Sequence, residues 1–242
     1  MNSTFASQLG GKHPAAQSSR NGRSELYRTY LLFGAPGSGK GTQGKALGTV
    51  PRFFHCACGD VFRSIDTRTK LGQAFIYYSG RGELVPDELS LELWKESILG
   101  AIEMHRFKPE LDILVLDGIP RSLKQAELME SRIEVLKVFH LSCPEHSTLV
   151  ARLKKRALKD NRLDDANEAV ICKRLETYEM ETKPILSHYD PALINTIDAT
   201  QSPARVLWEI LGVVTGMRSL ENPGRDHRRE LGKKHRLRSY IE

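Results

Sequence analysis

The chain has 242 residues, of which 40% are hydrophobic and 27% are charged, and this suits one α/β domain with small insertions or at most two small domains. No apolar run approaches the roughly 20 residues of a membrane helix, and the first 25 residues lack an apolar stretch, so we expect a cytoplasmic protein without a secretory signal or membrane partner. The four cysteines are too few and too irregularly spaced for a disulfide framework, and no second cysteine or histidine pair completes a zinc site with Cys56 and Cys58.

The formal net charge of +6 is concentrated at the two ends of the chain. Residues 224–242 hold seven Lys/Arg against three Asp/Glu, residues 1–25 hold three against one, and residues 26–223 are balanced at 26 against 26. Ser, Gly, Asn and Gln are frequent in residues 1–26, which we interpret as a disordered extension. We interpret residues 218–242 as a solvated basic tail, because they lack the interleaved aromatic residues of a nucleic-acid-binding arm apart from Tyr240.

Five short apolar runs predict buried strands, as expected for parallel strands that are covered on both faces. They are Tyr30–Phe33, Phe53–Cys56, Ile113–Leu116, Val135–Leu141 and Leu193–Ile197. Helical patterns lie among them over 88–105, 122–133, 145–156, 166–187 and 203–216. This alternation predicts an α/β fold with a five-stranded parallel sheet flanked by helices, doubly wound rather than closed into a barrel.

A glycine-rich loop follows the first predicted strand. The segment Gly34–Thr42 reads GAPGSGKGT, a variant of the phosphate-loop motif in which Gly41 stands before the hydroxyl of Thr42. Glycines let successive backbone N–H groups point at one anion, and a helix that begins near Lys40 adds the positive end of its dipole. Lys40 is then placed to reach the outer phosphates of a nucleotide, and Thr42 to bind Mg2+. The alternative is a glycine-rich turn with a chance lysine, which the flanking strand and helix disfavour.

A second polar cluster follows the third predicted strand. Asp117 comes directly after the run Ile113–Leu116, and open parallel sheets bind ligands at the carboxyl ends of their strands. Arg121 and Gln125 are four residues apart, so they share one face of a short helix. We interpret Asp117 as a metal partner, Arg121 as a phosphate ligand and Gln125 as an amide that faces a base edge.

Six arginines form a candidate clamp for a polyphosphate. They are Arg63, Arg121, Arg152, Arg156, Arg162 and Arg174. Each one alone is more readily explained as a solvated surface residue, but as a set beside a phosphate loop they indicate phosphoryl transfer, because arginine binds phosphate oxygens in pairs and stays charged. Such a reaction depends on positioning and electrostatic stabilisation and needs no protein nucleophile, and we find none.

The motifs together resemble those of the nucleoside monophosphate kinase family, and of adenylate kinases in particular. The matching segments are GAPGSGKGTQ, CACGDVFR, GELVPDE, LDGIPRSLKQAE, ARLKKR, NRLDDANEAVICKRLETY and IDATQSP, in family order over about residues 30–215. The resemblance implies a P-loop NTPase fold with a kinase domain over 27–217. It also implies a helical monophosphate-binding insert over 57–86 and a short lid over 157–166. The implied reaction is reversible, Mg2+-dependent transfer between ATP and AMP, giving two ADP.

The resemblance also implies a role for each matching residue. ATP would be bound by Gly37, Ser38, Gly39, Lys40, Gly41, Thr42, Arg152, Arg156 and Gln201. AMP would be bound by Cys58, Arg63, Glu83, Leu84, Val85, Gly118, Ile119, Pro120, Arg121, Gln125, Arg162 and Arg174. Transfer itself would depend on Lys40, Arg121, Arg152, Arg162 and Arg174, and Mg2+ would be organised by Thr42 and Asp117, largely through water.

Two departures from the family pattern bear on the acceptor. Position 58 is cysteine where adenylate kinases have threonine and UMP/CMP kinases usually have alanine, and a thiol is the weaker hydrogen-bonding group. Gln125 favours AMP, because the related pyrimidine enzymes have asparagine in that neighbourhood. A UMP/CMP kinase is therefore the alternative, and a non-catalytic nucleotide-binding module whose basic tails bind RNA is a remoter one. Only five residues separate Arg156 from Arg162, which leaves no room for a structural zinc site, and relatives with so short a lid are commonly monomers.

Overall fold

The structure is a computed structural model that describes residues 26–160, 165 and 167–216. The predicted N-terminal extension up to residue 25, Arg162 and the predicted basic tail lie outside the described residues, as do residues 161–164 and 166 of the predicted lid. The domain boundaries therefore stay predictions.

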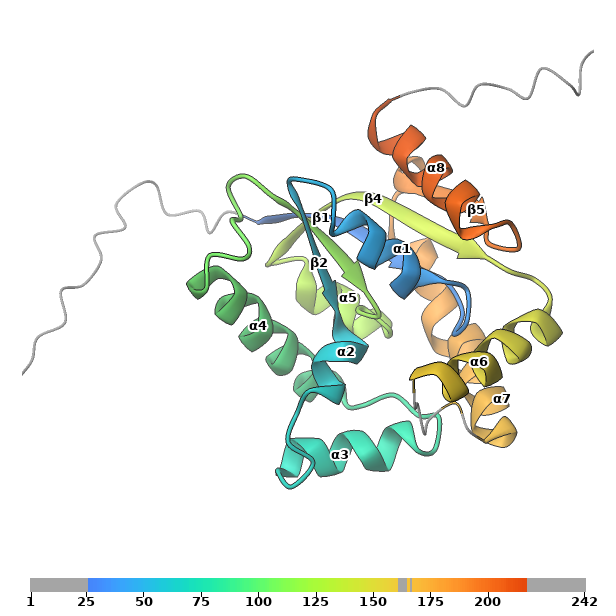
Figure 1. The fold of residues 1–242 in the computed structure, drawn as a ribbon. Helices are drawn as coiled ribbons and strands as arrows, with labels where there is room; N and C mark the ends of the chain where they lie inside the picture. Colours follow the sequence, from blue (N-terminus) through green and yellow to red (C-terminus); the bar gives the residue numbers. More distant parts are fainter. Residues whose placement is uncertain (1–25, 161–164, 166, 217–242) are drawn as a thin grey trace, which may run out of the picture.

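A five-stranded sheet forms the centre of the described part (Figure 1). Its strands are β1 (Tyr27–Phe33), β2 (Phe53–Ala57), β3 (Ile113–Asp117), β4 (Ile133–Ser142) and β5 (Ile194–Asp198). Their order is β2-β3-β1-β4-β5 and every pair is parallel, which confirms the predicted doubly wound parallel sheet. The connection from β1 to β2 covers one face of the sheet, and the connection from β3 to β4 covers the other face. The neighbouring carboxyl ends of β1 and β3 therefore border the crevice where such sheets bind ligands.

Helices cover both faces of this sheet. They are α1 (Lys40–Leu47), α2 (Cys58–Arg63), α3 (Lys70–Ser79), α4 (Asp87–Glu103), α5 (Leu123–Met129), α6 (His146–Asp160), α7 (Glu168–Thr177) and α8 (Pro203–Val214). The predicted insert over 57–86 contains α2 and α3, and α3 lies at the lower edge of the molecule in Figure 1, away from the sheet.

Three predicted helices end four or more residues from the predicted position, and the one predicted over 145–156 continues to Asp160. The helix predicted over 122–133 stops at Met129, because Ile133 pairs with Tyr27 and already begins β4. The helix predicted over 166–187 is α-helical only to Thr177 and continues as a π-helical turn, Tyr178–Thr182, and a 3-10 helix, Lys183–His188. Pro184 has no backbone N–H, so an α-helix could not continue through it. A second 3-10 helix, Pro191–Leu193, leads into β5.

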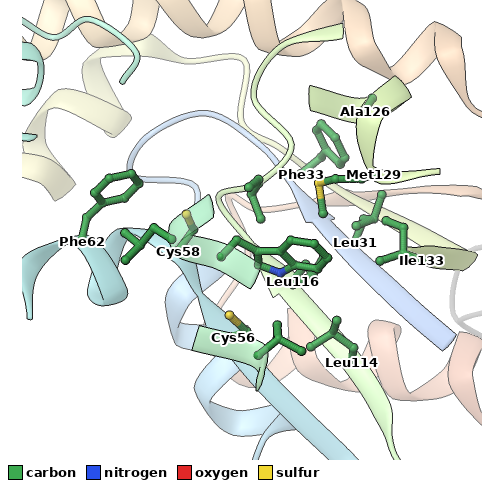
Figure 2. Packing of buried hydrophobic residues seen from close by; sticks show 14 of the residues in the cluster. Leu31, Phe33, Cys56, Cys58, Phe62, Leu114, Leu116, Ala126, Met129 and Ile133 are labelled. Carbon is green, nitrogen blue, oxygen red and sulfur yellow. The ribbon is translucent and has the colours of Figure 1, made fainter. Parts of the chain in front are cut away.

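The core consists of two apolar layers, one on each face of the sheet. Alternate residues of β1 point to opposite faces, so Leu31 and Phe33 belong to one layer and Tyr30 and Leu32 to the other. The first layer, drawn in Figure 2, is completed by α4 and α5, and the second by α1, α6, α7 and α8. No described helix combines the length and the apolar composition that a membrane crossing requires.

Candidate active site

A cavity of about 670 Å³ opens at the carboxyl ends of the central strands. The loop after β1, the loop after β3, the insert with α2 and α3, helices α6 and α7, and the start of α8 all contribute to its lining. Every site residue predicted from the sequence lines this cavity, with the exception of Arg162, which is outside the described residues. The fold thus gathers residues from positions 37 to 201 around one space.

The glycine-rich loop has a backbone that side chains could not follow. Gly34 has φ of +146°, and a Cβ there would lie 2.6 Å from the carbonyl oxygen of Leu141. Gly37 has φ of +85°, in the left-handed region that favours glycine, and its Cβ would be 3.0 Å from the carbonyl oxygen of Leu149. Gly39 is the N-cap of α1, so the loop leads directly into the helix N-terminus. The backbone N–H groups at this terminus can bind an anion.

Lys40 lies at the centre of the charged lining. Its Nζ donates to the carbonyl oxygens of Gly34 (2.6 Å) and Ala35 (3.1 Å). Burial lowers the pKa of Lys40 to about 8, and the positive charges of Arg121, Arg156 and Arg174 act in the same direction, whereas Asp117 opposes them. A cation held in these surroundings is strongly stabilised by a bound anion.

The cavity as a whole is basic. Among its described lining residues are nine lysines and arginines and four acidic residues, although residues 26–223 of the chain are balanced. A concave site lined mainly by one sign of charge attracts ligands of the opposite sign. The expected ligand is therefore a polyanion.

Asp117 and Thr42 supply the oxygen atoms that a magnesium ion prefers. Asp117 ends β3 beside Leu32 of β1, and its Oδ2 would be 3.4 Å from a Cβ on Gly41. The carboxylate therefore lies against the first turn of α1, one residue from Thr42. The described residues hold no group of three or more His, Cys, Asp or Glu that could bind a metal by themselves. Mg2+ does not need such a group, because it is usually held by one or two carboxylates together with phosphate oxygens. The residues present fit this ion.

The arginines of α6 and α7 are held by protein acceptors. Arg152 donates from Nη1 to the carbonyl oxygen of Ala199 at 2.8 Å. Arg156 donates from Nε to one carboxylate oxygen of Asp165 at 2.7 Å, and Arg174 pairs with the other oxygen. Asp165 is completely buried, so its charge offsets the repulsion between two cations on the same wall of the cavity. Sequence analysis missed Asp165, and no local signal marks it, because its two partners come together only when α6 packs against α7.

The loop after β3 and helix α5 contribute Arg121 and Gln125 to the cavity lining. Arg121 donates from Nε to the carbonyl oxygen of Gly118 at 2.8 Å, while its backbone N–H donates to Oε1 of Gln125 at 2.7 Å. Gln125 is 2% exposed, and its Nε2 donates to Asp87. Arg63, on the insert, pairs with Asp60 at 2.7 Å.

Cys58 lies at the floor of this side of the cavity. It is 3% exposed and belongs to the apolar layer that also contains Phe62 and Leu116 (Figure 2). Burial raises the pKa of the Cys58 thiol to about 11, with Arg121 acting in the opposite direction. The thiol is therefore neutral near pH 7, and it contributes a small apolar surface and a weak hydrogen-bonding group.

Two threonines connect helix α7 and the π-helical turn to the end of the insert and to the loop after β3. The Thr177 hydroxyl lies 3.1 Å from the carbonyl oxygen of Gly82, and that of Thr182 donates to the carbonyl oxygen of Arg121 at 2.9 Å. Gly82 has φ of +72°, and a Cβ there would be 3.0 Å from the carbonyl oxygen of Val170. The end of the insert is thus fixed closely against α7.

The far end of the cavity, beside α8, is less charged. Ala199, Gln201, Pro203 and Val206 line it. Gln201 donates from its side-chain amide to the carbonyl of Asp198 and to Glu209, at 3.2 and 3.1 Å. Gln43 of α1 donates to the carbonyl oxygen of Pro203 at 3.0 Å, which joins the glycine-rich loop's helix to this end. A flat apolar group joined to a phosphate chain would fit here, with its phosphates toward the N-terminus of α1 and the apolar group beside α8.

Comparison with known proteins identifies similar sequences over most of the chain. A family model described as adenylate kinase matches residues 32–193. An adenylate kinase from Cyanothece sp. is 38% identical over 191 residues, which cover 76% of this chain and 93% of the relative. The adenylate kinase of Mycoplasma pneumoniae is 33% identical over 72% of this chain and 91% of its own length, and that of Thermus thermophilus is 34% identical over 75% and 94%.

Proposed function

The chain belongs to the adenylate kinase family, and on this basis we propose how its cavity transfers a phosphoryl group reversibly between ATP and AMP, giving two ADP. The protein is a nucleoside monophosphate kinase. Because its relatives are adenylate kinases, the similarity supports AMP as the acceptor rather than UMP or CMP, the alternative suggested by Cys58. The observation that carries the mechanism is that the glycine-rich loop and Arg121 with Gln125 face one basic cavity from different sides.

ATP binds on the side of α1 and α8. The backbone N–H groups of residues 37–42 and the start of α1 hold its phosphates, and Lys40 exchanges its two loop carbonyls for phosphate oxygens. Arg152 and Arg156 neutralise the same phosphates from α6. The adenine lies in the less charged end beside Ala199 and Pro203, where the carbonyl oxygen of Gln201 accepts from its amino group.

Thr42 and Asp117 would hold Mg2+, largely through water. When bound, the ion neutralises negative charge on the phosphate oxygens during transfer. The charge of Asp117 partly offsets the burial that lowers the pKa of Lys40. The same carboxylate therefore also favours the charged form of Lys40.

AMP binds on the side of the insert. Arg63, Arg121, Arg162 and Arg174 contact its phosphate, and Gln125 reads its base above Cys58 and beside residues 83–85 and 118–120. The acceptor oxygen is already ionised, so no general base is required. In the transfer, the bond between the γ-phosphorus and the oxygen that links it to the β-phosphate breaks, and the bond to the AMP oxygen forms. Lys40, Arg121, Arg152, Arg162 and Arg174 stabilise the charge that spreads over the moving group.

The test is a coupled assay of the purified full-length chain with ATP, Mg2+ and one monophosphate at a time. We expect transfer to AMP at a kcat/KM at least about tenfold above that for UMP or CMP. Preference for UMP or CMP would overturn the choice of acceptor, and ATP binding without transfer would overturn the activity. Lys40→Met, which removes the central cation, is the control for contaminating kinases and should be nearly inactive.

We propose further that the protein acts as a cytoplasmic monomer that needs no nucleic-acid or membrane partner. The described site residues all line one cavity within a single chain, which supports a monomer. Light scattering after size exclusion would measure the oligomeric state, and a stable dimer would contradict it.

A further inference from the structure

Asp87 holds the amide of Gln125 from behind the cavity. It is the first residue of α4, and its Oδ1 accepts hydrogen bonds from the Ser122 hydroxyl (2.7 Å) and from Nε2 of Gln125 (2.9 Å). Ser122 caps α5 and accepts from the backbone N–H of Gln125 at 3.1 Å. Gln125 lines the cavity, whereas Asp87 and Ser122 are not among its described lining residues.

The neighbours of Gln125 permit only one orientation of its amide. Its Oε1 accepts from the backbone N–H of Arg121, which can only donate, and its Nε2 donates to the Asp87 carboxylate, which when ionised can only accept. A rotation of the amide by 180° would place donor against donor and acceptor against acceptor. Each unmatched buried pair would cost about 1–3 kcal/mol, so the amide is locked.

The locked amide keeps one donor and one acceptor for a ligand. An amide has two N–H donors and two carbonyl lone pairs, and Asp87 and Arg121 use one of each. Adenine offers a ring acceptor at N1 beside an amino donor, which matches such an edge. Hypoxanthine has the same outline but exchanges the two, with a donor at N1 and a carbonyl acceptor beside it.

We propose that Asp87 is a positioning residue that sets acceptor-base specificity, because it fixes the direction of the Gln125 amide and so admits adenine and rejects 6-oxopurines. This inference rests on the proposed function, in which Gln125 faces the acceptor base. Asp87 does not line the cavity, so it acts through Gln125. Of the two hydrogen bonds that fix the direction of the Gln125 amide, Asp87 accepts one.

The adjacent Glu88 provides a matched control. It is also a carboxylate in the first turn of α4 and also contacts α5, but its partner is the exposed Lys124. Asp87→Asn and Glu88→Gln therefore remove the same charge from the same helix end, and only the first removes one of the two constraints on the Gln125 amide. An asparagine at 87 can donate or accept, so it also tolerates the reversed amide.

The experiment measures kcat/KM of the full-length protein with AMP and with IMP, the monophosphate of hypoxanthine, after melting temperatures have shown that each variant is folded. In Asp87→Asn we expect the preference for AMP over IMP to fall at least about fivefold, because the variant removes one of the two mismatches that disfavour the reversed amide, each about 1–3 kcal/mol or a factor of about 5 to 150. The change should appear mainly in KM, with kcat within about twofold, since the base does not react. Glu88→Gln should keep the wild-type preference.

A double-mutant cycle separates positioning from a general structural role. If Asp87 acts through Gln125, the preference of Gln125→Ala should not change further when Asp87→Asn is added. Should Asp87→Asn fail to fold, Asp87→Ser replaces it, because a hydroxyl can also donate or accept.

An unchanged AMP preference in the folded Asp87 variant, or an equal loss in Glu88→Gln, would overturn the inference while the kinase activity stands. A wild-type protein that transfers to IMP as well as to AMP would do the same. A wild-type protein that transfers to no monophosphate would overturn the proposed function, and this inference with it.

Discussion

Asp165 occupies a completely buried position between Arg156 and Arg174. The two guanidinium groups belong to different helices and line the same cavity, where their charges repel each other. A single carboxylate with one oxygen toward each arginine holds both in place before any phosphate binds. The side chain therefore prepares the site for an anion at the cost of burying an acid.

We predict that Asp165→Asn lowers the free energy of unfolding by about 3 kcal/mol, since removing one partner leaves cations without compensation. Urea unfolding of the nucleotide-free protein measures this. Glu168→Gln, which removes an exposed pair with Lys154, is the control and should change stability by less than about 1 kcal/mol. Similar losses of stability in both variants would show that the pairs made by Asp165 stabilise the fold no more than an exposed ion pair does.

Lys40 should make ATP binding depend on pH near 8. Burial lowers its pKa to about 8 in the free protein, whereas phosphate oxygens favour the charged ammonium and raise that pKa. Binding therefore takes up a proton, and affinity should weaken as pH rises through 8, by up to about tenfold per pH unit. Calorimetry at pH 8 in two buffers of different ionisation enthalpy counts the proton.

Lys40→Arg is the control for this titration, because a guanidinium stays protonated across the range. Its affinity should vary little between pH 7.5 and 9.5, and its binding should take up no proton at position 40. Proton uptake that persists in this variant would assign the titration to another group.

At the residue scale, the described residues predicted to bind nucleotides lie around one cavity, whereas the supporting carboxylates were missed. Lys40, Asp117 and Arg121 lie in short motifs whose spacing is itself informative. Asp87 contacts Gln125 across 38 positions, and Asp165 becomes a partner of two arginines only after α6 and α7 pack together. No local pattern distinguishes these two acids from solvated ones.

Helix α1 approaches β2 unusually closely. Gly44 and Gly48 face His55 of β2, and an ideal Cβ on Gly44 would lie 2.2 Å from Nε2 of that imidazole. Burial lowers the pKa of His55 below its ordinary value, so the ring is neutral at pH 7 and packs as a flat, weakly polar group. Helix α1, which follows the glycine-rich loop, can lie this close to β2 only because positions 44 and 48 are glycines without a Cβ atom.

We predict that Gly44→Ala destabilises the protein by about 1–3 kcal/mol, because overpacking against the ring outweighs the helix propensity of alanine. Gly100→Ala in α4 is the matched control, since its Cβ would meet nothing within 4 Å. That substitution should stabilise by about 0.5–1 kcal/mol. Chemical denaturation of both variants measures the change in the free energy of unfolding. Stabilisation by both substitutions would show that His55 moves aside without cost.

At the element scale, strands were easier to predict than helix ends. Parallel strands covered on both faces are continuous apolar runs, and all five were found, with ends displaced by up to three residues. The helix predicted over 166–187 failed after Thr177, where the chain changes to π and 3-10 geometry. The apolar periodicity persists through that change, so it carried no signal of the new hydrogen-bond pattern, although Pro184 marked its end.

The whole molecule separates its charges. Residues 26–223 have no net charge, yet the cavity has an excess of basic residues, so the compensating acids lie elsewhere on the domain. The field that attracts a nucleotide is therefore local to the site and independent of the basic ends of the chain.

We predict that deletion of residues 224–242 leaves kcat/KM for AMP within about twofold, because every described lining residue of the cavity lies between residues 32 and 206. The deletion removes a net charge of +4. Any binding of the full chain to RNA at low salt should be reduced in the same variant. Loss of phosphoryl transfer would instead make the tail part of the site.

The contact between Thr177 and Gly82 limits how this enzyme can exclude water. A closing insert must rotate about some point, and its C-terminal end is fixed to α7 by a hydroxyl and by a glycine that leaves no space for a side chain. If the insert closes over bound nucleotides, we expect the part that carries α2 and α3 to move and Gly82 to stay in place against α7. Helix α7 also carries Arg174, which we propose to bind the acceptor phosphate, so one helix would support both phosphate binding and closure of the insert.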